Sequence, residues 1–518
     1  MTETKYDTKD KLLVKGDFSG IQEFIFNTKT KGAAKTLKGK SFYIQILAEL
    51  AIKHIEKKVG KNEVMCIYNG GGNFFLFVPN TVEVKSELSK CELTFAEELR
   101  NKGLMLILTT IEYQQGLNFG QNLSQLNQKA LEKSLNRFSN LESSWEALFQ
   151  AEVVNTNFDD EGKRVTESVI RKDSKPVVTY FGESFCLSES QTLSQSVNLQ
   201  IPKWNTYQKS YFSELKQENP NLEIEIGEYG EVLSFEHLGL LAKQRTGTDN
   251  LGILKLDLDN LGTIIRDDIK NIEQNQEFSA LLTKFFDEKL KDLITKKTFT
   301  VRENTYYYKD NLYVIFAGGD DAYLIGAWDA VVYFTQLFYK EFNAFFKENK
   351  PRFVTQNLTF SAGLVFVSSS FPVTIFSELA EEALAKAKTF KDSKNALTIF
   401  DYTIDWTQLE AIFEQMESFI KAIDTQGLPK SFLSKVKKTH SLYDNRFELT
   451  AITRLMYDLK ADKLKSVHKD LINSLKDSYK TYLQNALQDE SKKNEILILP
   501  IAARLAEFST RKTKKKDE

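Results

Sequence analysis

Two kinds of apolar segment each occur twice along the chain, in the same order. The first is an apolar run that ends in polar residues, Leu12–Gln22 (LLVKGDFSGIQ) and again Leu251–Gly262 (LGILKLDLDNLG). The second is a pair of apolar runs joined by glycines, Met65–Val78 (MCIYNGGGNFFLFV) and again Val314–Leu324 (VIFAGGDDAYL). Short apolar runs bounded by turn residues are typical of buried strands, and the glycines predict tight hairpins.

This repetition predicts two copies of one domain, because internal similarity in a fixed order is the signature of a duplicated unit. The matched polar positions are Lys15, Asp17 and Ser19 in the first copy and Lys255, Asp257 and Asp259 in the second. At the hairpin, GGGN in the first copy stands in place of GGDD in the second. The first copy therefore lacks the hairpin carboxylates, and we expect it to be a degenerate site.

Helical spacing of apolar residues predicts the elements between these strands. In the first copy we expect a helix opened by Ser41, helices near 82–102 and 121–150, and a strand at 104–113, which completes a βαββαβ, ferredoxin-like palm. In the second copy we expect a helix through 267–272, a longer one near 277–295, a helix at 326–349 and one after Pro372. From Trp406 onward the pattern is helical throughout.

The predicted fold class is therefore α+β, with two ferredoxin-like, nucleotidyl cyclase-like palms, a small middle domain and a C-terminal helical bundle. The expected boundaries are 1–151 for the first palm, 152–240 for the middle domain, 241–402 for the second palm and 403–518 for the bundle. A chain of 518 residues is too long for one ordinary domain, and a hydrophobic content of 42% supplies several cores.

Carboxylates at the ends of neighbouring strands predict a metal site in the second palm. Asp257 ends a strand, and Asp320 and Asp321 follow Gly318 and Gly319 on the hairpin. Oxygen ligands of this kind suit Mg²⁺ or Mn²⁺, completed by substrate phosphates. For GGDD alone, a solvated hairpin with a coincidental pair of aspartates is an equally good interpretation, and the upstream Asp-x-Asp strand favours the metal site.

Lysines offer two further candidate contacts for phosphate groups. The segment Thr28–Lys40 (TKTKGAAKTLKGK) is interpreted as a loop whose five lysines either contact phosphates or are simply solvated. Lys388 lies near the end of the helix after Pro372. It either contacts a triphosphate or belongs to a solvated face of this helix. The formal net charge is −2, so any RNA contact must come from such local patches.

Composition indicates a reduced, soluble protein. Three widely separated cysteines are typical of the cytoplasm, and the chain contains neither a signal-peptide pattern nor a long apolar span, so we expect a cytoplasmic protein without membrane contact. Cys186 stands alone and no Cys-x-x-Cys pair occurs, which argues against a four-ligand structural zinc site in the middle domain.

Five motifs in order resemble the large polymerase/cyclase-like subunit of type III CRISPR effector complexes: GDFSGIQEFIF, KGAAKTLKGKSFY, GGGN, LDLDNLG and GGDD. The resemblance covers most of residues 10–402. It implies that two palms pair face to face and that the active palm converts ATP into cyclic oligoadenylate messengers when the complex binds target RNA, in antiviral defence. It also implies guide RNA, a guide-end-binding subunit and a small helical subunit as partners.

By this resemblance Asp257, Asp320 and Asp321 hold two divalent ions for nucleotidyl transfer. Gly318 and Gly319 leave room for the triphosphate, with Asn260 and Lys388 nearby, and Asp259 either assists or holds the loop. In the first palm, Asp17 and Asn73 lie near the acceptor nucleotide.

Many members of the family begin with an HD nuclease domain. The four histidines of this chain form no His-Asp dipeptide, and its first palm begins near residue 10, so we expect no such nuclease in the chain. Two rival functions stay open: a stand-alone diguanylate or adenylate cyclase, and a catalytically silent scaffold in which GGDD persists only structurally.

Overall fold

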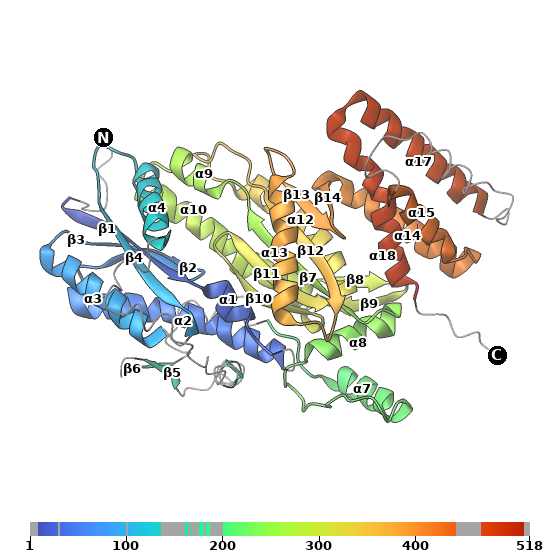
Figure 1. Ribbon diagram of the computed structural model, residues 1–518, viewed down its shortest axis with the longest axis horizontal. Helices are drawn as coiled ribbons and strands as arrows, with labels where there is room; N and C mark the ends of the chain where they lie inside the picture. Colours follow the sequence, from blue (N-terminus) through green and yellow to red (C-terminus); the bar gives the residue numbers. More distant parts are fainter. Residues whose placement is uncertain are drawn as a thin grey trace.

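The structure, a computed structural model, describes residues 9–29, 32–99, 102–135, 200–441 and 468–511, together with short segments between 160 and 186. Two β-sheets with their helices lie side by side, and the C-terminal helices stand beyond the second sheet, at the far end of the molecule from the first (Figure 1). Of the helices in these ranges, none combines the length and the apolar character needed to cross a membrane.

The first sheet has four antiparallel strands in the order β2-β3-β1-β4. This is the predicted βαββαβ order of a ferredoxin-like palm. Its elements are β1 (Lys11–Ser19), α1 (Ile21–Phe26), α2 (Ala33–Val59), β2 (Met65–Gly70), β3 (Asn73–Pro79), α3 (Val82–Leu99), β4 (Met105–Glu112) and α4 (Phe119–Leu135). The remainder of the helix expected near 121–150 lies outside the described residues.

The second sheet has six strands in the order β10-β11-β7-β12-β13-β14. Its first four repeat the 2-3-1-4 order of the first sheet, and β13 adds to β12 in parallel. Its elements are β7 (Asn250–Leu258), α9 (Leu261–Asp268), α10 (Ile272–Thr283), a π-helical segment (Lys284–Lys289), α11 (Leu290–Lys296), β8 (Thr298–Val301), β9 (Asn304–Tyr307), β10 (Leu312–Gly318), β11 (Asp321–Ala327), α12 (Trp328–Asn349), β12 (Phe360–Ser368), α13 (Val373–Thr389), β13 (Ala396–Ile399) and β14 (Tyr402–Asp405).

The two sheets share their cores. On the first sheet, alternate residues of β1 point to opposite faces: Leu12 and Val14 pack with α2 and α3, whereas Leu13 packs with α4 and with α10 of the second palm. On the second sheet, Tyr313 and Ile315 face the core that contains α2 of the first palm. Because each palm buries side chains against helices of the other, their relative position is fixed by hydrophobic packing.

The duplication extends to local irregularities. A register shift interrupts the β2–β3 pairing between Cys66 and Tyr68, and another interrupts the β10–β11 pairing between Val314 and Phe316. Both hairpins thus carry a bulge at the same distance from the turn. A bulge increases local twist and redirects the strand end, so both glycine turns are bent in the same way.

Between the palms, α7 (Thr206–Glu218) and α8 (Phe235–Thr246) pack around Trp204, Phe212 and His237. A two-stranded sheet is formed by β5 (Pro176–Tyr180) and β6 (Glu183–Cys186). Most of residues 136–199 lie outside the described part of the chain, so the domain boundaries expected at 151 and 240 stay predictions.

The predicted helical C-terminal region is confirmed. It contains α14 (Leu409–Gln426), α15 (Ser431–Ser441), α17 (Lys469–Gln488), a 3-10 segment (Glu490–Leu497) and α18 (Ile498–Ser509). Its apolar side chains belong to the same core as the helices of the second palm. Arg302, in the β8–β9 turn, donates to Asp424 and to the carbonyl of Ser509, which ties this palm to the helices.

Three local predictions are wrong. The expected loop Thr28–Lys40 is helical from Ala33 onward, and Ser41 is buried inside α2 rather than at its start. Gly39 lies within this helix where another segment packs closely against it. A Cβ at this position would be 1.8 Å from the carbonyl oxygen of Gly162, so the packing requires glycine. The helix expected through 267–272 ends at Asp268, and Asn271 caps the next helix through its side chain.

The outer edge of the first sheet is covered by lysines of α4. Lys129 donates to the carbonyl of Thr110, and Lys133 donates to the carbonyl of Leu108, both at 2.8 Å. Lys133 also pairs with Glu92 at 2.7 Å. These contacts satisfy carbonyl groups of β4 that face away from the sheet.

Candidate active site between the palms

The GGDD turn is held in a fixed position at the end of β7. Gly318 and Asp321 close the hairpin, with φ angles of 152° at Gly318 and 67° at Gly319 that favour glycine. The backbone N–H of Leu258 donates to the carbonyl of Asp320 at 2.8 Å, which ties the turn to the neighbouring strand. The turn therefore presents two carboxylates from a rigid backbone.

The structure brings the three predicted aspartates to one place. Asp257 and Asp321 are register partners on adjacent antiparallel strands, and Asp320 precedes Asp321. The ammonium group of Lys388, in the last turn of α13, lies 2.5 Å from Oδ1 of Asp257. Lys388 is thus at the carboxylates, as its candidate role requires, and in this structure it neutralises Asp257.

Electrostatic crowding shows in the pKa values of these groups. Burial raises the pKa of Asp321 to about 8, and the charges of Asp320 and Asp257 add to the shift. Burial and the charge of Asp257 also raise the pKa of Asp320. Carboxyl groups that resist ionisation when packed together are the donor set that a divalent cation stabilises.

The chemistry of the donors therefore fits Mg²⁺ or Mn²⁺, although their present arrangement does not form a finished site. Within the described part of the chain, no three acidic, histidine or cysteine side chains are placed so that they could hold a metal ion. Asp257 is engaged by Lys388, so metal binding would require this lysine to move.

Asp259 holds the site together and does not point into it. It is buried, and its carboxylate accepts hydrogen bonds from Thr359 at 3.0 Å, Ser361 at 2.8 Å and the backbone N–H of Asn395 at 3.0 Å. It thereby joins the end of β7 to the β12 and β13 segments. Of the two roles considered from the sequence, the structure supports holding the loop.

Asn260 begins α9 in the left-handed conformation, with a φ of 56°, and its side chain makes no capping hydrogen bond. Asparagine tolerates this conformation better than most residues. Its side chain is half-buried beside the acidic strand end, so its candidate role in ligand binding stays a prediction.

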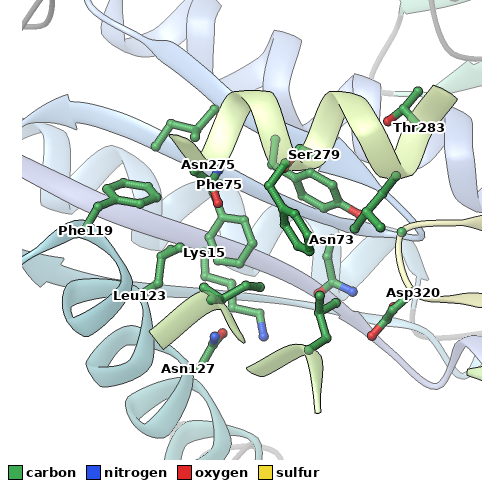
Figure 2. Close-up of a pocket in the computed structure, with 17 residues that line it drawn as sticks. Lys15, Asn73, Phe75, Phe119, Leu123, Asn127, Asn275, Ser279, Thr283 and Asp320 are labelled. Atoms are coloured by element: carbon green, nitrogen blue, oxygen red, sulfur yellow. The ribbon is translucent and has the colours of Figure 1, made fainter. Parts of the chain in front are cut away.

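A cavity of about 210 Å³ lies between the two hairpins. Lys15 and Asn73 of the first palm and Gly319 and Asp320 of the second line it together. Figure 2 shows Asn73 and Asp320 near each other on one side of the cavity and Phe119 on the other. The lining does not include Asp257, Asp321 or Lys388. Of the three aspartates, Asp320 is the one that lines the cavity.

Asn73 and Asp17 occupy the positions that the duplication predicts. They are register partners on β1 and β3, as Asp257 and Asp321 are on β7 and β11. The side-chain oxygen of Asn73 is buried without a hydrogen-bond partner, which is costly unless a ligand or water supplies a donor. Asp17 pairs with Lys15 at 3.7 Å and does not line the cavity.

The sequence analysis missed Tyr68, which connects the two hairpins. A Cβ on Gly319 would lie 2.8 Å from the hydroxyl oxygen of Tyr68, so this tyrosine of the first palm rests against the GGDD turn. Burial raises the pKa of Tyr68, and the charges of Asp320 and Asp321 raise it further, so the hydroxyl keeps its proton. The only sequence signal for this contact is that Tyr68 lies two residues before the GGGN turn.

Two lysines of the segment Thr28–Lys40 have other partners than phosphate. Lys38 is fully buried and donates to the carbonyls of Val314 and Ile315, at the bulge of β10. Lys40 donates to the carbonyl of Asn27 at 2.7 Å and to the hydroxyl of Thr28 at 2.8 Å. For these two residues the phosphate-binding interpretation is wrong, and Lys31 lies outside the described residues.

Comparison with known proteins finds a family model for each palm. Residues 11–152 match the family model described as Csm1 subunit domain B, and residues 250–398 match that described as Cas10/Cmr2, second palm domain. Along both palms the chain is similar to the Cas10/Csm1 family. This confirms the resemblance drawn from the five motifs, since the two matched regions contain them all.

Two curated relatives carry the description CRISPR system single-strand-specific deoxyribonuclease Cas10/Csm1 (subtype III-A). The protein of Methanocaldococcus jannaschii is 27% identical over 81% of this chain and 65% of its own length. The protein of Mycobacterium tuberculosis is 24% identical over 86% of this chain and 61% of its own length. The chain thus spans slightly less than two thirds of these relatives.

Solved structures share the fold. A Csm1-Csm4 cassette in complex with pppApA matches with a TM-score of 0.69 and 17% identity, over 97% of this chain and 70% of that one. A Csm1-Csm4 cassette in complex with cA4 matches with a TM-score of 0.64 and 20% identity, over 96% and 70%. This likeness confirms the α+β arrangement of palms and helices.

Proposed function

We propose that this chain is the nucleotide-polymerising subunit of a type III CRISPR effector complex and that it joins ATP into cyclic oligoadenylates. One observation carries the proposal: the GGDD turn of the second palm and the GGGN turn of the first meet at one cavity. The related Csm1-Csm4 cassettes with pppApA, cA4 and ATP support adenine nucleotides as ligands of such a fold.

In the proposed reaction, Asp257, Asp320 and Asp321 hold divalent cations. Such ions lower the pKa of an attacking ribose hydroxyl and neutralise the leaving pyrophosphate. Gly318 and Gly319 leave space for the triphosphate next to the carboxylates. Lys388, released from Asp257, moves its charge to the phosphates, and the unpaired oxygen of Asn73 accepts a hydrogen bond from the second nucleotide.

The proposed partners are guide RNA and target RNA, a guide-end-binding subunit that corresponds to Csm4, and a small helical subunit docked on the C-terminal helices. The Csm1-Csm4 cassettes that share the fold support the proposed pairing with Csm4. The proposed location of this assembly is the cytoplasm.

A test uses the assembled complex with guide and target RNA, incubated with ATP and Mg²⁺ or Mn²⁺, and mass spectrometry of the products. Target-dependent oligoadenylates that vanish in Asp320→Ala/Asp321→Ala would support the proposal. A mixed adenylate product, found with other nucleotides or adenosyl cofactors in parallel, would keep the mechanism and change the messenger. A diguanylate product made by the free chain would favour a stand-alone cyclase instead.

The silent scaffold is the second candidate, and the Lys388–Asp257 contact favours it, because it occupies a carboxylate that the metals require. The scaffold predicts no product under any condition while target RNA is still bound. Turnover that depends on Asp257 would exclude it.

Single-strand DNA cleavage, which the relatives' names describe, is a separate question. We propose that the residues of this chain do not supply it, because none of its four histidines precedes an aspartate. Robust Mn²⁺-dependent cutting of single-stranded DNA by the pure chain would contradict this.

A further inference from the structure

A second, larger groove gathers exposed aromatic side chains of the described residues. In the ranges that the structure covers, the large aromatic side chains that are mostly open to solvent are Tyr207 (51% exposed), Tyr229 (76%) and Tyr307 (50%). All three line one groove of about 980 Å³. It lies between the segment around α7 and the β8–β9 hairpin, and it shares no lining residue with the cavity between the palms.

The tyrosines are held in place. Asn205 and Gln208 form a reciprocal capping box at the start of α7, which fixes the first turn that carries Tyr207. The hydroxyl of Tyr207 donates to Gln244 at 3.1 Å. The turn that carries Tyr229 is held by the N–H of Gly230, which donates to the carbonyl of Trp204 at 2.9 Å. Exposed rings on a rigid backbone lose little entropy on binding.

Basic residues outnumber acidic ones in the lining of the groove. Lys203, Lys291 and Lys309 line it, and Asp310 is the one carboxylate of its lining. Arg245 also lines it, but this guanidinium forms two hydrogen bonds with the buried carboxylate of Asp329, so its charge is balanced. The ammonium group of Lys309 lies 4.9 Å from the ring centroid of Tyr307, which places a cation beside an aromatic face.

We propose that this groove binds a single strand of RNA. Nucleobases stack on the exposed tyrosine rings while the lysines meet the phosphates, which is the usual design of sites for single-stranded nucleic acid. Asn304 and Thr305 supply amide and hydroxyl groups that can bond to a ribose 2′-hydroxyl. A peptide helix would need exposed aliphatic anchors, whereas Ile201 and Leu241 of this groove are buried.

This inference rests on the RNA partnership proposed above, and it concerns a surface that is separate from the nucleotidyl-transfer site. Binding and turnover can therefore be measured independently on the same variants. The strand bound here is read by stacking and charge, so we expect little dependence on its sequence.

The experiment measures fluorescence anisotropy of a labelled, unstructured RNA of about 12 nucleotides, within the site size of such grooves, with the full-length chain. The variant Tyr207→Ala/Tyr229→Ala/Tyr307→Ala should bind about 1,000-fold more weakly, since each of the three lost stacking contacts costs roughly 10-fold. Lys309→Gln should weaken binding several-fold and reduce the salt dependence by roughly one phosphate contact.

The matched control is Leu93→Ala/Leu131→Ala/Leu135→Ala, which removes three exposed apolar side chains on the first palm. It should bind RNA like the unchanged chain. All substituted side chains are at the surface, and circular dichroism confirms that each variant folds.

Unchanged RNA affinity in the triple tyrosine variant would overturn the proposal, and so would an equal loss in the leucine control. Equal affinity for DNA of the same sequence would overturn the assignment to RNA. The variant Asp320→Ala/Asp321→Ala should keep its RNA affinity. If the complex makes no product but RNA binding depends on the tyrosines, the groove stands and the proposed reaction fails.

Discussion

The two hairpins have the same backbone and different chemistry. Both carry a bulge, a glycine turn and a polar residue paired with an aspartate on the central strand. In the first palm that polar residue is the neutral Asn73, and in the second it is Asp321, whose pKa is raised to about 8. Because the fold tolerates a neutral hairpin, the crowded carboxylates of the second are not needed for folding, which agrees with the cation binding proposed for them.

The largest expected effect is a loss of nucleotide turnover when the aspartate beside the second hairpin is changed. In the assembled complex, Asp257→Asn should lower nucleotide turnover by about 100-fold or more, because it removes a charge needed to hold the cations. The equivalent change in the first palm, Asp17→Asn, should lower it much less. Initial rates at saturating ATP measure both, and equal losses would show that the palms contribute alike.

The next comparison concerns stability. Asp259→Ala leaves the hydroxyls of Thr359 and Ser361 and the N–H of Asn395 without their acceptor, so the free energy of unfolding should fall by roughly 2–3 kcal/mol. Ser19, at the matching position of the first palm, is half-buried, and Ser19→Ala should cost under about 1 kcal/mol. Urea denaturation of both variants tests the difference.

Glycine substitutions separate backbone strain from contact between the palms. A Cβ at Gly71 would have open space around it, so Gly71→Ala should lower the free energy of unfolding only by the backbone strain of a φ of 61°. This strain is about 1 kcal/mol. Gly319→Ala adds a clash with the hydroxyl of Tyr68, so it should lower the free energy of unfolding by about 1 kcal/mol more than Gly71→Ala does. The double variant Gly319→Ala/Tyr68→Phe should recover part of that loss; no recovery would mean that the two hairpins do not touch.

The last comparison concerns the pH dependence of stability. The pKa of Asp321 is raised in the folded chain, so between its ordinary value near 4 and about 8 the folded state binds more protons than the unfolded state. Stability of the metal-free chain should therefore fall as pH rises through this window. Asp321→Asn should flatten the fall, and thermal melts from pH 5 to 8 measure it. A fall of equal size in the variant would assign the effect to other groups.

Much of the fold and the placement of the aspartates could be predicted, because the duplicated strands carry their polar residues at fixed register positions. Asp17 and Asp257 face Asn73 and Asp321 in the structure as their matched spacing predicts. The buried lysines could not be predicted. Gly32 and Gly39 resemble loop residues, and only the approach of Gly162 explains a glycine inside a helix.

Contacts between the copies were also beyond the sequence pattern. Tyr68 and Lys38 each bind the opposite palm, and neither follows from periodicity within one palm. Likewise, the role of Asp259 depends on partners about a hundred residues away along the chain. Pattern analysis identifies which residues share a strand face, whereas hydrogen bonds between distant segments need coordinates.

The lysines that cover β4 have a consequence for behaviour at high concentration. An open strand edge offers carbonyl groups on which a strand of another molecule can add, and this is a common start of aggregation. Lys129 and Lys133 occupy two such carbonyls and place positive charge along the edge. The first palm is thereby protected against edge-to-edge polymerisation, and removal of both amino groups should shorten the time to visible precipitate.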